Sequence, residues 1–255
     1  MEQLISHPII FLAVSFALMT LAGWIGFAVL RRKTPLDDDV RDDFGVIQSA
    51  TLTLLALVIG FSLSMAVGRY DQRKTYEEEE ANAIGTEYLR ADLLPAADAA
   101  TLRALLPKYL EQRIRFYQER DSEQLAEVDA ATTKLENALW TAVKTSAVAQ
   151  PNPVTALAVA GMNDVINTQG YTQAAWRNRV PKGEWSLMIL IGLLCNLLIG
   201  YGSRSRTMKM RILWVIPATI SISFMLIADI DSPRSGTIRV VPQNLISVAQ
   251  SMTSP

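Results

Sequence analysis

The stretch that decides the fold reads FGVIQSATLTLLALVIGFSLSMAVG over residues 44–68 and continues as RYDQRKTYEEEEANAIGTEYLRADLLP to residue 95. No charged residue interrupts the run from Phe44 to Gly68, and about 20 apolar residues are enough for a helix to cross the hydrocarbon core of a bilayer. The charged continuation has no proline before Pro95, so nothing in it forces the helix to end. The sequence predicts one long helix, half in lipid and half in water.

Apolar residues, which make up 50% of the chain, gather in four blocks: 8–30, 44–68, 185–201 and 212–230. Lipid offers no hydrogen-bond partners to backbone amides, so each block must be a helix. The sequence therefore predicts an all-α membrane protein with four transmembrane helices and an extramembrane helical domain between the second and third. The expected divisions are a transmembrane hairpin over 1–69, the helical domain over 70–184, a second hairpin over 185–232 and a C-terminal tail over 233–255.

The basic residues of the two short hairpin loops predict the topology. They are Arg31, Arg32, Lys33 and Arg41 in the first loop and Arg204, Arg206, Lys209 and Arg211 in the second. Short loops rich in Lys and Arg stay in the cytoplasm. We therefore expect the N-terminus and the helical domain to lie outside.

Helix-start signals divide the polar central segment. Asp121 or Ser122 can cap one helix, and Asn152 followed by Pro153 is typical of an N-cap with proline in the first turn. No stretch alternates with the period of two that a strand would show. The central segment is therefore expected to be helical throughout.

The second apolar block carries a face of small residues at intervals of three and four. This face consists of Ser49, Thr53, Ala56, Gly60, Ser64 and Gly68. Such a stripe favours close helix packing; the alternative is that, together with the adjoining Gln48, it lines a water-filled path. Phe61, on a neighbouring face, could form an apolar constriction of that path or simply face lipid.

Acidic residues suggest two further candidate sites. Glu77, Glu79 and Glu80 belong to a run of four glutamates, which is either a solvated, salt-bridged face or, repeated around an oligomer axis, an acidic ring that concentrates cations. Asp229 and Asp231 close the fourth block. They form either an interfacial salt bridge with Arg234 or Arg239, or a cation or gating site.

Small and polar residues in the third apolar block predict helix packing. Gly192, Asn196 and Gly200 recur at four-residue spacing. An amide in a bilayer needs a hydrogen-bond partner, most simply across a helix interface.

Composition excludes several classes of function. The formal net charge of −1 argues against nucleic acid as a partner. The only histidine is His7, the only cysteine is Cys195, and the chain has no metal-ligand spacing, phosphate loop or nucleophile elbow. We expect no catalytic residues, no metal and no cofactor.

Three sequence blocks carry a family resemblance: the run from Arg69 to Pro95, LRALLPKYLEQRIRFY, and the closing DIDSPRSGTIRV. They resemble the signature blocks of a bacterial membrane family called bestrophin-like. The resemblance implies a multi-pass protein of the bacterial inner membrane. It also implies kinship to bestrophins, which are pentameric anion channels whose second span lines the pore neck.

Two features depart from the bestrophin pattern. Bestrophins keep their large domain in the cytosol and line their neck with bulky apolar rings, whereas this chain has the opposite loop charges and a small, hydroxylated stripe. The leading hypothesis is a homo-oligomeric ion channel, pentameric by resemblance, that handles inorganic ions in a lipid bilayer. The alternative is a non-conducting membrane scaffold or sensor whose helical domain binds a partner.

Overall fold

Helices form all the regular secondary structure that a computed structural model describes, over residues 7–203 and 214–253. The chain divides into two compact units. The first, here called the apolar unit, comprises Met1–Gly68 and Arg179–Arg239. The second, here called the polar unit, comprises Arg69–Asn178 and Val240–Pro255. The predicted all-α class agrees with this structure.

Helix α4, Arg41–Arg90, is the long helix predicted from the opening stretch. It contributes its first part to the apolar unit and the remainder to the polar unit, and a 3-10 turn, Ala91–Leu93, ends it before Pro95. A single helix over this stretch is thereby confirmed. A continuous helix satisfies its backbone hydrogen bonds internally whatever surrounds it, and the sequence contains no breaker to interrupt it.

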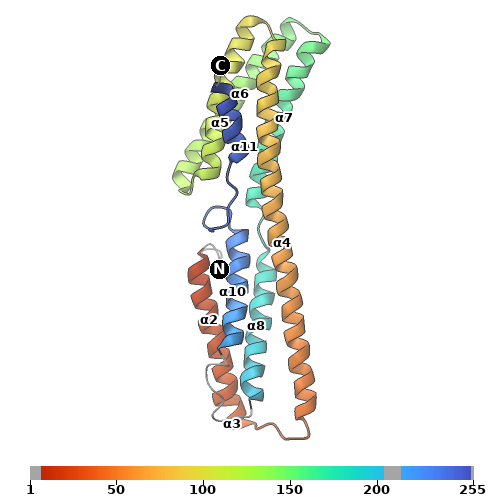
Figure 1. Ribbon diagram of the computed structural model, residues 1–255, viewed down its shortest axis with the longest axis vertical. Helices are drawn as coiled ribbons and strands as arrows, with labels where there is room; N and C mark the ends of the chain where they lie inside the picture. Colours follow the sequence, from red (N-terminus) through yellow and green to blue (C-terminus); the bar gives the residue numbers. More distant parts are fainter. Residues whose placement is uncertain (1–6, 204–213, 254–255) are drawn as a thin grey trace. The chain divides into compact units, whose positions relative to one another are not determined.

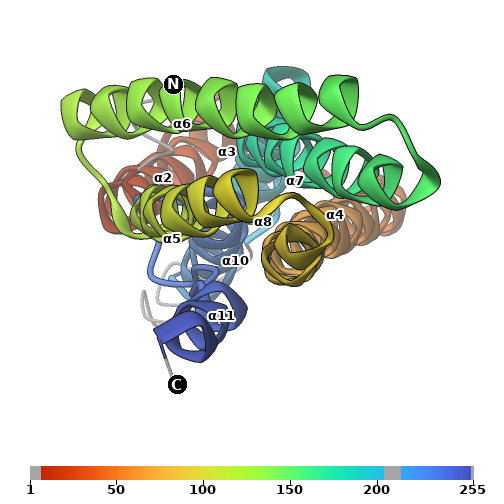
Figure 2. The same ribbon diagram turned by 90° about the horizontal axis from the view of Figure 1, so that it is seen from above.

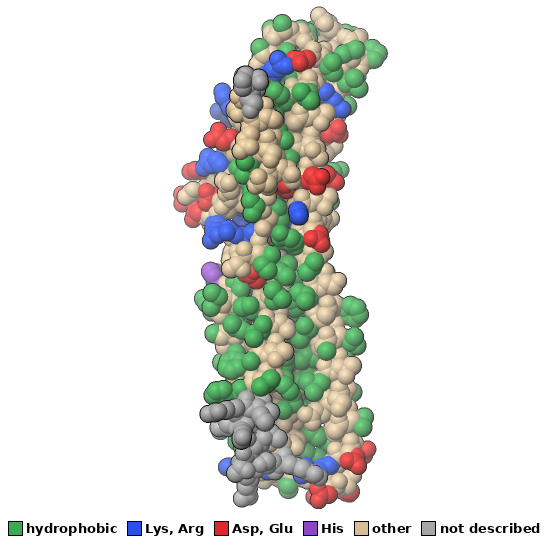
Figure 3. All heavy atoms as spheres, viewed as in Figure 1, with side chains coloured by type: hydrophobic (Ala, Val, Ile, Leu, Met, Phe, Trp, Pro, Cys, Tyr) green, Lys and Arg blue, Asp and Glu red, His purple; other side chains and the backbone are tan. Residues whose placement is uncertain are grey.

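The apolar unit packs α2, Pro8–Ile25, against α8, Lys182–Gly202, and α10, Val215–Asp231 (Figure 1). A π-helical turn, Gly26–Leu30, and the short α3, Arg31–Lys33, follow α2. Phe11, Trp185 and Phe224 join the three main helices, with ring centroids 5.2 to 6.4 Å apart. On the face shown in Figure 3, hydrophobic side chains are spread widely over this unit.

Within the residues that the structure describes, three stretches are long and apolar enough to cross a membrane: Pro8–Lys33, Arg41–Leu93 and Pro153–Gly202. They contain the first three apolar blocks. The fourth corresponds to α10, which has 17 residues. The start of that block and the basic residues of the second hairpin loop lie outside the described residues.

The polar unit consists of the end of α4 with α5, Ala96–Gln118, α6, Ser122–Ala149, and α7, Pro153–Arg177. Figure 2 shows α6 lying alongside α5 and α7. Asp121 caps α6 by accepting hydrogen bonds from two backbone amides, and Asn152 forms a capping box at the start of α7. Both predicted starts are confirmed, and buried Leu106, Leu139 and Met162 contribute to the core.

A further helix, α11, Gln243–Thr253, lies in the segment expected to be a tail. Its Leu245 is buried in the core of the polar unit. Residues 240–255 therefore belong to the polar unit, whereas the segment up to Arg239 belongs to the apolar one.

Candidate functional site: the second apolar helix and its acidic continuation

The small face of α4 is not covered by the rest of the chain. All the candidate pore-lining residues except half-buried Gln48 are exposed: Ser49, Thr53, Ala56, Gly60, Phe61, Ser64 and Gly68. The hydroxyls of Ser49 and Thr53 donate to backbone carbonyls four residues earlier, at 2.7 and 2.9 Å, so each is satisfied within the helix. Phe61 is 71% exposed.

Another face of α4 is the one that packs inside the apolar unit. Leu55, Ser62 and Ala66 are at most 2% exposed. At Gly60 and Gly68, by contrast, an added Cβ would meet nothing within 4 Å. Packing within one copy of the chain therefore does not require small residues on the exposed face.

Gly192, Asn196 and Gly200 lie where α8 meets neighbouring helices. A Cβ at Gly200 would collide with the backbone of Gly23, and one at Gly192 would press on Met19. Asn196 is 2% exposed, and its Nδ2 donates to the Gly192 carbonyl at 2.8 Å. The amide therefore has its partner within its own helix, where the sequence suggested one across a helix interface.

Glu80 lies at the centre of a buried polar cluster. One carboxylate oxygen accepts from Arg113 Nε, and the other accepts from the Tyr117 and Thr172 hydroxyls, both at 3.1 Å. Burial opposes the charge on Arg113, but the Glu80 carboxylate, together with Tyr109 and Tyr117, outweighs it and raises the pKa of the guanidinium. Burial and the same carboxylate raise the pKa of Tyr117. The cluster joins α4, α5 and α7 within the polar unit.

Glu77 binds the start of α11. Its carboxylate accepts from the backbone amides of Asn244 and Leu245 at 2.9 and 3.0 Å, and from Asn244 Nδ2 at 2.6 Å. These amides would otherwise lack partners at a helix N-terminus. Glu77 thus caps α11 from another helix.

The prediction that Glu77, Glu79 and Glu80 form an acidic ring around an axis therefore needs correction. Glu77 and Glu80 are 1% and 0% exposed, and carboxylates bound inside their own chain cannot also face a water-filled axis. Only Glu79 of the three candidates is exposed. It lies beside a groove of about 460 Å³ between α4 and α7, together with Arg90 and Asp164.

Glu87, which the sequence did not single out, is the most perturbed carboxyl of this region. It is 0% exposed, and neither carboxyl oxygen has a hydrogen-bond partner among the described residues. Burial raises its pKa to about 8; the charge of Arg90 opposes this effect and that of Asp164 adds to it. A Cβ at Gly161 of α7 would collide with both Glu87 and Arg90, which explains a glycine at that position.

Asp229 and Asp231 both bind backbone amides. Asp229 accepts from the Thr237 and Ile238 amides and the Thr237 hydroxyl, at 2.7 to 3.0 Å. Asp231 accepts from the Val180 amide at 3.1 and 3.2 Å. The two aspartates therefore fix the turn after α10 and the segment before α8. Among the described residues, no group of three or more His, Cys, Asp and Glu side chains could hold a metal ion.

The sequence matches the family model of the Bestrophin-like domain over residues 13–245. No curated protein matches it. A bacterial Bestrophin homolog from Klebsiella pneumoniae is 14% identical, with a TM-score of 0.66 over 93% of this chain and 98% of that one. A variant of that homolog has a TM-score of 0.68 at 13% identity, over 94% of this chain and 97% of that one.

A structure described as a membrane protein gives a TM-score of 0.67 at 13% identity, over 96% of this chain and 97% of that one. At these identities the likeness concerns the fold. The family resemblance seen in the sequence blocks is confirmed by the family model.

Proposed function

This chain belongs to the Bestrophin-like family, and from that premise we propose that it forms a homo-oligomeric ion channel of the bacterial inner membrane. In this proposal four helices of each copy span the bilayer, and the fourth is the one that contains α10. The α4 helices surround a central axis, and the copies number five by resemblance to bestrophins.

The observation that carries the proposal is the uncovered small face of α4. Lipid does not require glycine, serine and threonine on a helix surface, because large apolar side chains fill lipid-facing positions as well or better. Packing within the chain does not require them either, since Gly60 and Gly68 face open space. A face of this kind suits a helix that either approaches other copies closely or leaves room for water around an axis.

The flank of the small face supports the same arrangement. Leu54, Leu57 and Met65 are exposed beside it, as expected where a helix turns from the axis toward neighbouring copies or lipid. Phe61 lies on this border and supplies a bulky apolar side chain for a constriction. The hydroxyls of Ser49 and Thr53 offer polar atoms to permeating ions without placing a charge at membrane depth.

Recordings on purified, reconstituted protein test the proposal. Unitary currents are expected from the wild type, and Ser64→Trp should abolish them because it fills the small face. Met65→Trp is the control: it places the same final side chain at the next residue, on the flank of the small face, and should leave conduction intact. Native mass in detergent must show the same oligomer for all three proteins. If the folded, oligomeric wild type shows no current, the result would instead favour the non-conducting scaffold.

Ion selectivity is tested at Glu79. Its exposed carboxylate should attract cations near the conduction path, so Glu79→Gln is expected to shift the reversal potential in a salt gradient toward anions. Glu123→Gln removes an exposed carboxylate from the first turn of α6 and serves as the control. Equal reversal potentials for all three proteins would remove Glu79 from the permeation path.

A further inference from the structure

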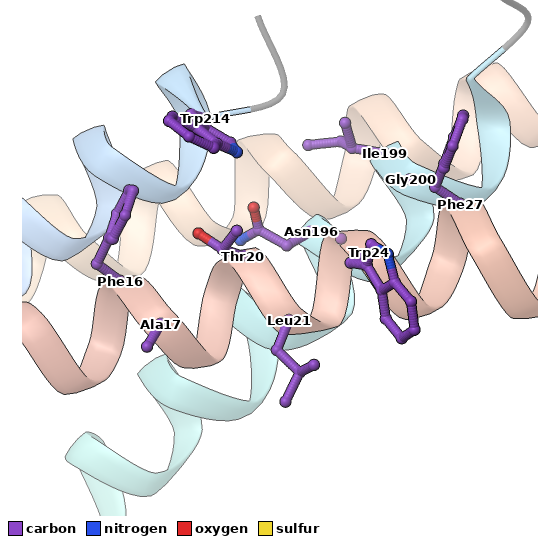
Figure 4. A pocket seen from close by; sticks show the side chains of 11 residues that line it. Phe16, Ala17, Thr20, Leu21, Trp24, Phe27, Asn196, Ile199, Gly200 and Trp214 are labelled. Atoms are coloured by element: carbon purple, nitrogen blue, oxygen red, sulfur yellow. The ribbon is translucent and has the colours of Figure 1, made fainter. Parts of the chain in front are cut away.

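An aromatic-walled pocket of about 500 Å³ lies in the apolar unit, separate from the face of α4. Figure 4 shows Phe16, Trp24 and Trp214 around it. Residues of α2, the π-helical turn after it and α8 line it together with the residue preceding α10, and none of the described lining residues is charged. Its volume lies within the range of small-molecule sites, which are mostly apolar with a few fixed polar groups.

Two polar side chains meet in this pocket, Thr20 of α2 and Asn196 of α8 (Figure 4). The Thr20 hydroxyl oxygen is buried and has no hydrogen-bond partner within the described part of the chain. Thr53 and Thr219 of the same unit, by contrast, each donate to the carbonyl four residues earlier. The Nδ2 group of Asn196 donates a hydrogen bond to the Gly192 carbonyl. Its side-chain oxygen, Oδ1, can therefore accept a hydrogen bond from a bound molecule.

The position of these two polar groups is fixed by close packing. Gly200, one turn after Asn196, is so near the backbone of Gly23 that no Cβ fits between them. Gly23 is in turn one turn after Thr20. The distance between Thr20 and Asn196 is therefore set by the contact of two helix backbones and does not depend on flexible side chains.

We propose that this pocket binds a small, uncharged aromatic molecule with a hydroxyl group, of the phenol class. A hydroxyl can donate to Asn196 Oδ1 and accept from Thr20 Oγ1 at the same time. The ring packs among the aromatic side chains, which prefer stacked or edge-on contacts with another ring. A charged ligand would lose its hydration without gaining a counter-charge, and a lipid acyl chain would leave both polar atoms unpaired.

The test uses 4-bromophenol and the tryptophan fluorescence of the full chain in detergent, since bromine quenches an indole that it touches. We expect saturable quenching that loses amplitude in Trp24→Phe. Thr20→Val keeps the shape of the side chain but removes the hydroxyl, and should weaken binding about fivefold, the effect of one hydrogen bond. Asn196→Leu should weaken it further. Thr219→Val, the same change on α10 away from the pocket, should leave binding unchanged.

Three results would overturn the proposal. Quenching that rises linearly and equally in Thr20→Val and Thr219→Val would mean that the probe only partitions into detergent. Equal binding of 4-bromoanisole, which has the same ring but no hydroxyl proton, would exclude the hydrogen bond to Asn196. Quenching of Trp24 by a phospholipid with brominated acyl chains, undiminished by phenol, would identify a lipid tail as the occupant. Unfolding temperatures of all variants show that the comparison concerns folded protein.

Discussion

Replacing Glu87 by glutamine should remove a pH-dependent loss of stability from the polar unit. In the folded chain the carboxyl is buried without a hydrogen-bond partner among the described residues, and burial raises its pKa from 4.5 to about 8. Arg90, on the same helix, and Asp164, on α7, are the charged groups that act on it. A raised carboxyl pKa means that the folded state holds the proton more tightly than the unfolded state does.

The sign and size follow from proton linkage. Between pH 4.5 and about pH 8 the unfolded chain loses this proton while the folded chain keeps it, so the free energy of unfolding falls as pH rises. Above pH 8 both states are ionised and the loss is complete. The difference between the two pKa values, about 3.5, corresponds to roughly 5 kcal/mol at 1.36 kcal/mol per pKa unit. Glutamine is neutral at every pH, so the Glu87→Gln variant lacks this pH-dependent loss in the free energy of unfolding.

The assay is thermal unfolding of purified protein from pH 5 to pH 9. The unfolding temperature of Glu87→Gln should rise relative to that of the wild type across this range. The difference should reach a value on the order of 10 °C at a pH where the wild-type carboxyl is ionised in both the folded and the unfolded state. Glu78→Gln, at an exposed position of the same helix, should follow the wild type. Parallel curves for wild type and Glu87→Gln would refute the reasoning, because they would show that Glu87 has the same pKa in both states.

Three further outcomes are expected. Glu80→Gln should destabilise the polar unit by about 3–5 kcal/mol, since it leaves the Arg113 guanidinium buried without its counter-charge; an effect no larger than that of Glu78→Gln in denaturant unfolding would contradict this. Glu77→Ala should cost about 1–2 kcal/mol of helix capping and speed hydrogen exchange over residues 243–253, and unchanged exchange there would show that Glu77 does not hold α11. Ser122→Cys in a Cys195→Ala background should react with a membrane-impermeant thiol reagent in intact cells, whereas protection until the cells are opened would reverse the expected topology.

Local signals in the sequence predicted the local structure of this chain. The uninterrupted run after Phe44 predicted α4, and Asp121 and Asn152 marked the starts of α6 and α7. Each of these features depends on residues within a few positions of one another. Helix α11 was missed because it is short and lies among residues expected to be a tail, although Leu245 and Val248 already have helical spacing.

The partners of the acidic residues could not be predicted in this way. Arg113 lies 33 positions from Glu80, and Asn244 lies 167 positions from Glu77. Asp229 binds the backbone of the turn at Thr237 and Ile238, whereas the sequence suggested an arginine. Backbone amides carry no sequence signature, so a carboxylate that binds them looks the same as one that is solvated.

The burial of Glu77 and Glu80 changes what the acidic run means for a channel. Read from the sequence, the run of glutamates favours cations, because an acidic ring repeated around an axis concentrates them. In the folded chain two of them bind α11 and Arg113 internally, and only Glu78 and Glu79 remain exposed. Charges that lie close to the water-filled path and have no internal counter-charge act most strongly on a permeating ion. The expected preference for cations therefore depends on Glu79 and its neighbour, and the reversal potential of Glu79→Gln is the measurement that decides it.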